Sequence, residues 1–355
     1  MSCCSTSNNA MVSIASDRDI APMTSMGVSA MADRLVCFTS AADLSRLQEQ
    51  GLLDDAVVVG GGSNMLFVTS PLHRPLLHPA MNTYQATPVM DAALSPSLRQ
   101  VMLHVDAGVV LDDIVAITCR LGLWGLENLS LIPGHIGGAA VQNVGAYGAE
   151  LADVVIAVDA YDKFTGRVVT IPASRLDYGY RHSVFKDEAN ASRYIVTAVD
   201  ICLSASPAPR LGYKALAEAV SDIDALTPQH MRDAVIAMRR SKLPDVGVVG
   251  SVGSYFKNPV VEAAVGEAFS ASNPEAPAFR LPDGQVKLSA AWLIDHAGCR
   301  DMRVGGASLW PRQPLVLVND GYNATAADVV ALEQMIRDRV SEVYGVSLEC
   351  EVVKI

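Results

Sequence analysis

The chain has 355 residues, half of them hydrophobic and 18% charged, which excludes a disordered chain and leaves room for two or three domains with buried cores. The formal net charge is -11. An acidic balance of this size argues against nucleic acid or an anionic membrane surface as a partner, although a local basic pocket can still bind an anionic small molecule.

The cysteines and the N-terminal residues both favour a cytoplasmic protein. Seven cysteines are scattered along the chain without a CxxC pair, which predicts reduced thiols and neither a zinc site nor a disulfide framework. Residues 1–26 are rich in Ser, Met and Ala and lack the basic and apolar parts of a signal peptide, so we expect a disordered tail. No apolar run reaches the ~18 residues of a membrane span.

The first predicted elements lead into a glycine turn. A short strand at 34–38 and a helix at 41–51, capped by Ser40, precede the run Val57-Val-Val-Gly-Gly-Gly-Ser-Asn-Met-Leu-Phe-Val68. This run predicts strand, turn, strand, and the turn is a candidate phosphate-binding nest. Because the residues after it are β-like rather than helical, a Rossmann nucleotide site is disfavoured.

A second glycine-rich stretch, Gly125–Gly148, follows a predicted strand at 101–107 and a helix at 111–121. Five glycines come after Pro133, and the stretch contains no Lys or Arg. Glycine lets the backbone approach a ligand closely, and successive N–H groups then bind an anion without cationic side chains. The length predicts a ligand longer than one phosphate. The alternative is a pair of tight turns in an ordinary loop.

The remaining elements indicate an α+β chain. Strands are predicted at 154–162, 167–171, 193–203 and 315–319, and helices at 228–241, 290–297 and 326–344; residues 163–166 form a hairpin turn. The proline-rich segment 206–210 predicts a domain boundary. The basic cluster at 239–242 is either an anion site or a favourable cationic helix end.

Several motifs in one order resemble a known family. The two glycine loops, Tyr178-Gly-Tyr-Arg-His-Ser-Val-Phe-Lys186, Lys242-Leu-Pro244 and Gly253-Ser-Tyr-Phe-Lys-Asn-Pro259 resemble the UDP-N-acetylenolpyruvoylglucosamine reductase (MurB) family over residues 24–355. The resemblance implies an FAD-binding fold of the vanillyl-alcohol-oxidase (PCMH) type and an α+β substrate domain. We therefore expect a disordered tail at 1–26, FAD-binding subdomains at 27–95 and 96–207, and a substrate-binding domain at 208–355.

The same resemblance implies an oxidoreductase, UDP-N-acetylmuramate dehydrogenase, of peptidoglycan and cell-wall synthesis, and hence of cell shape and division. NADPH reduces noncovalent FAD, and a hydride then passes from flavin N5 to C3 of the enolpyruvyl group of UDP-N-acetylenolpyruvoylglucosamine. A protein acid protonates C2, which gives UDP-N-acetylmuramate. A cytoplasmic monomer without a metal is expected.

The catalytic roles are carried over by resemblance to Arg181, Ser254 and Glu351. Arg181 would bind the substrate carboxylate and stabilise the enolate-like charge, Ser254 would protonate C2, and Glu351 would assist. Taken alone, these residues also fit an ion-pair arginine, a Gly-Ser turn and one face of an edge strand. Ser251 is the nearby alternative serine, and Cys350 stands where the family often has Pro.

The binding residues follow from the same motifs. Expected FAD contacts are Gly60, Gly61, Gly62, Ser63, Asn64, Met65, Pro133, Gly134, Gly137, Gly138, Ala139, Gln142, Asn143, Gly145, Ala146, Tyr147 and Gly148. Expected substrate contacts are Tyr213, Arg239, Lys242, Lys257 and Asn258.

Two alternative functions stay open, besides the question of how the flavin is attached. His135 in the second loop fits a polar loop residue better than a covalent flavin tether. A flavin-dependent alcohol or sugar oxidase on the same fold would lack the three catalytic residues and react quickly with oxygen. A non-enzymatic nucleotide-sugar-binding protein would retain the fold without the chemistry.

Overall fold

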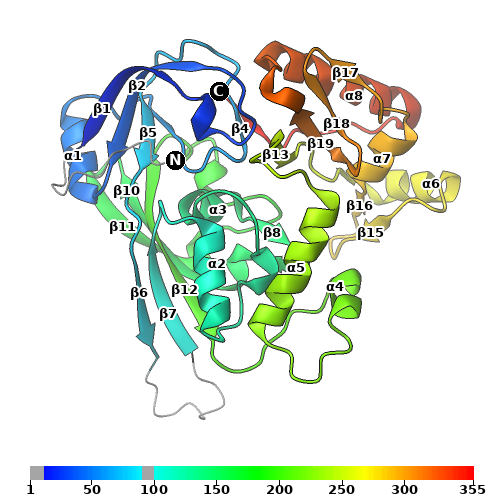
Figure 1. The fold of residues 1–355 in the computed structure, drawn as a ribbon, viewed down its shortest axis with the longest axis horizontal. Helices are drawn as coiled ribbons and strands as arrows, with labels where there is room; N and C mark the ends of the chain where they lie inside the picture. Colours follow the sequence, from blue (N-terminus) through cyan, green and yellow to red (C-terminus); the bar gives the residue numbers. More distant parts are fainter. Residues whose placement is uncertain (1–11, 90–99) are drawn as a thin grey trace. The chain divides into compact units, whose positions relative to one another are not determined.

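A computed structural model describes residues 12–89 and 100–355, and it divides the chain into two compact units (Figure 1). Of these residues, unit 1 contains 12–18, 32–61, 72–89 and 100–239, and unit 2 contains 19–31, 62–71 and 240–355. Both units combine helices with strands, which confirms the predicted α+β class.

Unit 1 contains a sheet of order β1-β2-β5-β3, in which β5 pairs in parallel with both β2 and β3. Its strands are β1 (Ser13–Asp19), β2 (Met31–Phe38), β3 (Val57–Val58) and β5 (Leu76–Pro79). Helix α1 (Ala41–Glu49) follows β2, and the side chain of Ser40 accepts a hydrogen bond from the Asp43 amide. The predicted N-cap of this helix is therefore confirmed.

The second sheet of unit 1 is antiparallel, in the order β11-β10-β12-β7-β6. Its strands are β6 (Tyr84–Pro88), β7 (Gln100–Asp106), β10 (Val155–Asp162), β11 (Arg167–Pro172) and β12 (Tyr194–Ser204). The hairpin turn predicted at 163–166 joins β10 to β11. Helix α2 (Leu111–Arg120) follows β7 and packs Leu111, Ile114 and Val115 into the core of the unit.

The glycine-rich stretch contains a short helix that the sequence did not predict. Helix α3 (Ile136–Gln142) begins at the third residue after Pro133, and the stretch ends in β8 (Gly145–Ala146), next to β9 (Ala149–Glu150). Two adjacent glycines lower helix propensity, so the pattern indicated only a loop. A Cβ on Gly137 would lie 2.7 Å from the Cβ of Ala107, so glycine there lets the helix pack closely beside the end of β7.

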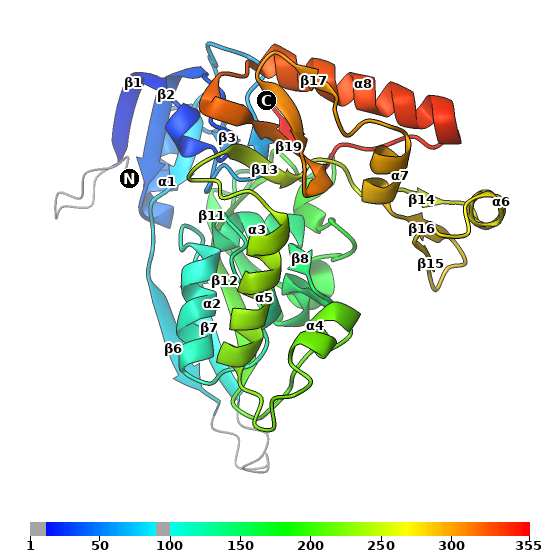
Figure 2. The same ribbon diagram turned by 45° about the vertical axis from the view of Figure 1, so that its right-hand side comes forward.

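Unit 1 extends past the domain boundary predicted at 207/208. Helices α4 (Lys214–Ala219) and α5 (Pro228–Lys242) follow that point, and the hydroxyl of Thr227 caps α5 by accepting from the His230 amide. The apolar face of α5 packs on Trp124 and Leu216, which keeps residues as far as 239 with unit 1. Both views show α5 beside α2 (Figures 1 and 2), where Arg232 forms an ion pair with Asp112 at 2.5 Å. The boundary predicted at 95/96 lies outside the described residues.

Unit 2 is built on a sheet of order β13-β19-β18-β17. Its strands are β13 (Gly250–Ser254), β17 (Arg303–Val304), β18 (Ala307–Trp310) and β19 (Gln313–Asn319). The predicted helices at 290–297 and 326–344 are confirmed as α7 (Ala290–His296) and α8 (Ala326–Tyr344), and Thr325 and Asp328 form a capping box on α8.

Smaller elements complete unit 2. A three-stranded sheet has the order β14-β16-β15, and β20 pairs in parallel with β4. Their bounds, with those of the remaining helix, are β4 (Met65–Leu66), β14 (Val260–Val261), α6 (Ala263–Ser272), β15 (Ala278–Arg280), β16 (Val286–Leu288) and β20 (Val353–Lys354).

The prediction of a disordered tail is wrong for residues 12–26. They form β1 and a 3-10 turn (Ala21–Met23), and the side chains of Ile20 and Met26 are almost completely buried. The apolar residues among the polar ones explain the order, because Met26 packs into the core of unit 2. Residues 1–11 lie outside the described part of the chain.

Two further observations concern the compartment and metal predictions. In the ranges 12–89 and 100–355 no helix is long and apolar enough to cross a bilayer. Within the same ranges no group of His, Cys, Asp and Glu side chains could hold a metal ion. Cys119, Cys202, Cys299 and Cys350 are free thiols. Cys3 and Cys4 lie outside the described residues.

Candidate functional site

The two glycine loops meet inside unit 1. A Cβ on Gly61 would lie 2.7 Å from the Cα of Gly134, and a Cβ on Gly60 would lie 3.5 Å from the Cβ of His135. The second loop is held in place because the amide of Leu111 donates to the carbonyl of Gly134 at 3.0 Å. Segments more than 70 residues apart therefore lie side by side and form one glycine-lined surface.

The structural reason for glycine differs from one position of this surface to the next. A Cβ on Gly138 would meet nothing within 4 Å, and Gly138 is exposed at the first turn of α3, so a ligand can approach its backbone there. Gly62 instead belongs to unit 2 with Ser63, Asn64 and Met65. A Cβ on Gly62 would collide with the carbonyl oxygen of Met23, so chain packing already accounts for that glycine.

His135 is a neutral imidazole beside these glycines. Burial lowers its pKa to about 4, and the nearby ring of His78, with its centroid at 5.6 Å, adds to the effect. The Nδ1 atom of His135 is buried and has no hydrogen-bond partner among the described residues. A buried polar atom without a partner commonly marks a place where a water or a ligand belongs.

Arg181 occupies a strained position in a tight turn. The amides of Gly179 and His182 each donate to the other's carbonyl, at 3.2 and 3.1 Å, so that Tyr180 and Arg181 form the tip of the turn. Arg181 has a φ of 54°, the left-handed region that glycine prefers at this point of such a turn. Its guanidinium lies over the Tyr180 ring and donates through Nη2 to the carbonyl of Gly145 at 3.1 Å.

Side-chain hydrogen bonds tie this turn to the end of α3. The Asn143 amide donates to the carbonyl of Gly179 at 2.9 Å, and the Ser183 hydroxyl donates to the carbonyl of Val141 at 2.5 Å. The ammonium of Lys186 donates to Gln142 Oε1 at 2.8 Å and to the carbonyl of Arg181 at 2.7 Å. The arginine turn and the glycine-rich stretch therefore form one hydrogen-bonded assembly within unit 1.

This assembly gives internal roles to two predicted cofactor contacts. Asn143 is fully buried in the left-handed conformation that ends α3, and its side chain also bonds Glu150 Oε2 and the amide of Ala152. The side-chain oxygen of Gln142 is engaged by Lys186. Lys186 itself was not among the predicted site residues, although it ends the motif that identified Arg181.

Ser254 and Ser251 differ in exposure within β13 of unit 2. Ser251 is 1% exposed, and its hydroxyl accepts a hydrogen bond from the amide of Gly253 at 3.1 Å. Gly253 has a φ of 76° at an irregularity in the pairing of β13 with β19, and Ser254 beyond it is half-buried. The geometry thus leaves Ser254 as the more accessible of the two hydroxyls.

Glu351 is brought close to Ser254 by backbone pairing within unit 2. Its amide donates to the carbonyl of Tyr255 at 2.8 Å, and Cys350 forms a bridge with Phe256. The carbonyl of Glu351 accepts a hydrogen bond from the side-chain amide of Asn64 at 3.2 Å. Burial raises the pKa of the Cys350 thiol to about 11, so this side chain is an uncharged thiol at neutral pH.

The predicted substrate residues are distributed over both units. In unit 1, Tyr213 contacts the Tyr147 ring edge-on, with centroids 5.2 Å apart. Burial lowers the pKa of Arg239, and its buried Nε has no partner among the described residues. In unit 2 the side chain of Lys242 is exposed, while its carbonyl accepts from the Trp310 indole.

Lys257 and Asn258 have structural partners. Lys257 forms an ion pair with Glu349, and its amide donates to the Glu349 carbonyl at 2.9 Å. Asn258 Oδ1 accepts from the amide of Ala290 at 3.0 Å at the start of α7. Both residues therefore support the segments that carry Ser254 and Glu351.

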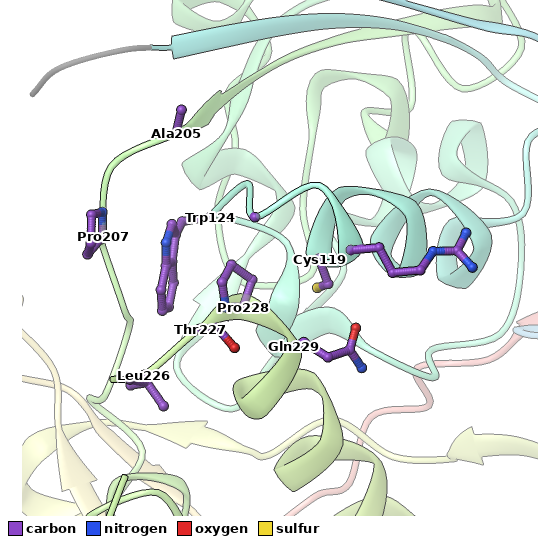
Figure 3. A pocket seen from close by; sticks show the side chains of 10 residues that line it. Cys119, Trp124, Ala205, Pro207, Leu226, Thr227, Pro228 and Gln229 are labelled. Atoms are coloured by element: carbon purple, nitrogen blue, oxygen red, sulfur yellow. The ribbon is translucent and has the colours of Figure 1, made fainter. Parts of the chain in front are cut away.

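A separate hollow of about 560 Å³ lies in unit 1 at the end of α2 and the start of α5 (Figure 3). Trp124, Pro207 and Pro228 are among its lining residues, none of which belongs to the predicted site. Burial raises the pKa of Cys119, another lining residue, to about 12, so this thiol is not activated as a nucleophile.

Comparisons with known proteins agree with these observations. The family described as the C-terminal domain of UDP-N-acetylenolpyruvoylglucosamine reductase matches residues 245–355, and the FAD binding domain family matches residues 54–172. A reductase of that name from Porphyromonas gingivalis (strain ATCC BAA-308 / W83) is 37% identical, over 96% of this chain and 98% of its own length. One from Neisseria meningitidis serogroup C (strain 053442) is 39% identical, over 94% and 95%.

A solved structure shares the fold along nearly the whole chain. The crystal structure of UDP-N-acetylenolpyruvylglucosamine reductase (MurB) from Thermus caldophilus aligns with a TM-score of 0.66 and 25% identity, covering 98% of this chain and 99% of that one. This match and the FAD binding domain confirm the predicted fold. The chain belongs to the UDP-N-acetylenolpyruvoylglucosamine reductase family of flavin-dependent oxidoreductases.

Proposed function

We propose that this chain reduces UDP-N-acetylenolpyruvoylglucosamine to UDP-N-acetylmuramate with electrons that NADPH supplies through FAD. The observation that carries the proposal is the assembly in unit 1, where the turn of Arg181 is hydrogen-bonded to the end of the glycine-rich stretch. The glycine-rich backbone would bind the anionic part of the cofactor, and Arg181 would bind a carboxylate. A reaction between a dinucleotide cofactor and a carboxylate substrate requires both groups in fixed positions.

The residues of unit 1 fit a noncovalently bound FAD. The open backbone at Gly138 and the unpartnered Nδ1 of His135 lie on the surface where the two loops meet, and no cationic side chain belongs to either loop. Backbone N–H groups would therefore hold the pyrophosphate. When bound, FAD supplies the acceptor for the NADPH hydride and the donor of the hydride to the substrate.

On the substrate side, Arg181 would bind the carboxylate and stabilise the negative charge that develops beside it. Ser254 would deliver the proton to C2, since its hydroxyl is half-buried at the end of β13 while that of Ser251 is occupied. A serine is a weak acid, so it requires a polar neighbour. Glu351 is a suitable one because its backbone pairs with Tyr255, the residue after Ser254.

The UDP portion requires a separate set of groups. By the family resemblance, Arg239 and Lys242 would bind the diphosphate, and Tyr213 would cover the nucleotide or sugar. Lys257 and Asn258 would contribute mainly by supporting the neighbouring backbone. We also propose that the protein acts in the cytoplasm as a monomer, as expected from the family resemblance.

One assay tests the proposal. Purified protein should be yellow, and its oxidation of NADPH should depend on added UDP-N-acetylenolpyruvoylglucosamine. A colourless protein that binds the UDP-sugar would support a non-enzymatic binding protein. Rapid reoxidation of the flavin by oxygen, together with turnover of an alcohol or a sugar, would support an oxidase.

A further inference from the structure

The position of Arg181 requires an explanation beyond its charge. A side chain with a φ of 54° at the tip of a two-residue turn is strained, and such strain persists only where the surroundings over-determine the conformation. The reciprocal bonds between Gly179 and His182 close the turn but do not involve the polar groups of Arg181. Outside the turn, the guanidinium donates to the carbonyl of Gly145, which holds the end of the side chain. A contact on the backbone carbonyl of Arg181 would fix the strained residue itself.

Lys186 makes that contact. Its ammonium lies 2.7 Å from the carbonyl oxygen of Arg181 and 2.8 Å from Oε1 of Gln142, the last residue of α3. One charged group thus joins the peptide unit that follows the strained Cα to the helix of the glycine-rich stretch. Hydrogen bonds from a charged donor are roughly twice as strong as neutral ones, so this contact fixes the orientation of that peptide more firmly than the neighbouring contacts do.

We propose that Lys186 is a positioning residue: it holds Arg181 in its left-handed conformation and fixes the guanidinium relative to the cofactor loop. Lys186 acts through the carbonyl of Arg181 and the amide oxygen of Gln142, without itself contacting a substrate. This inference rests on the proposed function in one respect, namely that Arg181 binds the substrate carboxylate.

A purely structural role predicts something different. If Lys186 served only to stabilise the end of α3, its loss would weaken flavin binding and both half-reactions together. A positioning role predicts that flavin binding and reduction by NADPH are retained while the steps that depend on Arg181 are impaired. Misplacement of a binding group by about 1 Å can cost on the order of 10²-fold in rate.

The test compares Lys186→Met, which keeps the alkyl chain and removes the ammonium, with Lys186→Arg, which keeps a charged donor. Lys163→Met is the matched control: the Lys163 ammonium likewise donates to a backbone carbonyl in unit 1, that of Leu53 at 2.7 Å, but it lies outside the arginine turn. Stopped-flow absorbance follows flavin reduction by NADPH and reoxidation by the enolpyruvyl substrate separately. Hydrogen exchange of the peptide 178–186 is measured on the same variants without substrate.

We expect Lys186→Met to bind FAD and to be reduced by NADPH at near the parent rate, with reoxidation slowed by roughly 10–100-fold and faster exchange in 178–186. Lys186→Arg should recover part of both losses, and Lys163→Met should show neither. Parent-like reoxidation and exchange in Lys186→Met, or equal loss in both half-reactions, would overturn the inference. If the parent protein failed to use the enolpyruvyl substrate, the proposed function would fail, while the exchange result would still decide whether Lys186 holds the turn.

Discussion

At the residue scale, the two serines of β13 allow a controlled test of the proton donor. Ser254→Ala removes the half-buried hydroxyl and leaves both glycine loops unchanged, so NADPH should still bleach the flavin at near the parent rate. Reoxidation by the enolpyruvyl substrate should fall by roughly 10²–10⁴-fold, the usual scale for a positioned acid. Stopped-flow flavin absorbance measures both steps.

Controls for this experiment come from the same strand. Ser254→Cys should recover part of the rate, because a thiol can also donate a proton. Ser251→Ala loses the hydrogen bond from the Gly253 amide and should lower stability slightly while leaving reoxidation fast. An equal slowing of both half-reactions in Ser254→Ala would show that this serine is structural.

The imidazole of His135 predicts a pH dependence of stability for the protein without flavin. Its pKa is about 4 in the folded chain against 6.5 for an ordinary histidine, so between these values the unfolded state binds a proton that the folded state excludes. Stability must therefore fall as the pH decreases from about 6.5 to about 4. The shift corresponds to at most about 3 kcal/mol.

His135→Asn removes this titration and introduces a residue type that is favourable at the N-cap position, which His135 occupies on α3. Denaturant unfolding of the flavin-free protein at pH 7.5, 6 and 5 should give a smaller decrease in stability for the variant than for the parent. Identical slopes would show that the pKa of His135 is the same in the folded and unfolded states, contrary to its burial.

At the element scale, the two glycine loops should respond differently to a single methyl group. Gly138→Ala places a Cβ in open space and should leave folding unchanged, while Gly61→Ala forces a Cβ to within 2.7 Å of the Gly134 Cα and should separate the loops. Gly138→Asp adds a carboxylate where backbone donors are proposed to bind a pyrophosphate. Flavin per folded chain should therefore fall in Gly61→Ala and Gly138→Asp. Full occupancy in both would exclude these loops as the cofactor site.

The same elements show what the sequence could and could not provide. Amphipathic periodicity and capping residues located α1, α2, α5 and α8 to within a few residues, since those signals are local. Helix α3 was missed because one of its two glycines, Gly137, is required by contact with Ala107, which is distant in sequence. The turn of Arg181 was located only as a motif: its left-handed conformation and its bond to Lys186 depend on the position of α3.

At the scale of the whole molecule, unit 2 is assembled from three separate segments. Residues 19–31 and 62–71 contribute Met26, Val28 and Leu66 to a core that otherwise comes from residues beyond 240. Sequence patterns taken in chain order could not predict this arrangement, and they placed Met26 in a disordered tail. The family match at 245–355 therefore covers most of the unit but lacks part of its core.

The segment 245–355 produced alone should not fold as a cooperative unit. Three buried side chains of its core would be missing, and each removed large apolar side chain costs about 2–5 kcal/mol in typical cores. We expect a broad thermal transition and binding of a hydrophobic dye, measured against the full chain. A sharp transition with native near-ultraviolet circular dichroism would show that the early segments are dispensable.

Because unit 2 is assembled from three segments, its parts are synthesised at well-separated times. Between residue 71 and residue 240 the ribosome adds 169 residues (240 − 71), which takes about 10–30 s at usual elongation rates. During that interval the apolar side chains of 19–31 and 62–71 have left the ribosome before most of their packing partners exist. Nascent chains should therefore depend on a holdase chaperone that shields these early segments until the rest of the unit is synthesised.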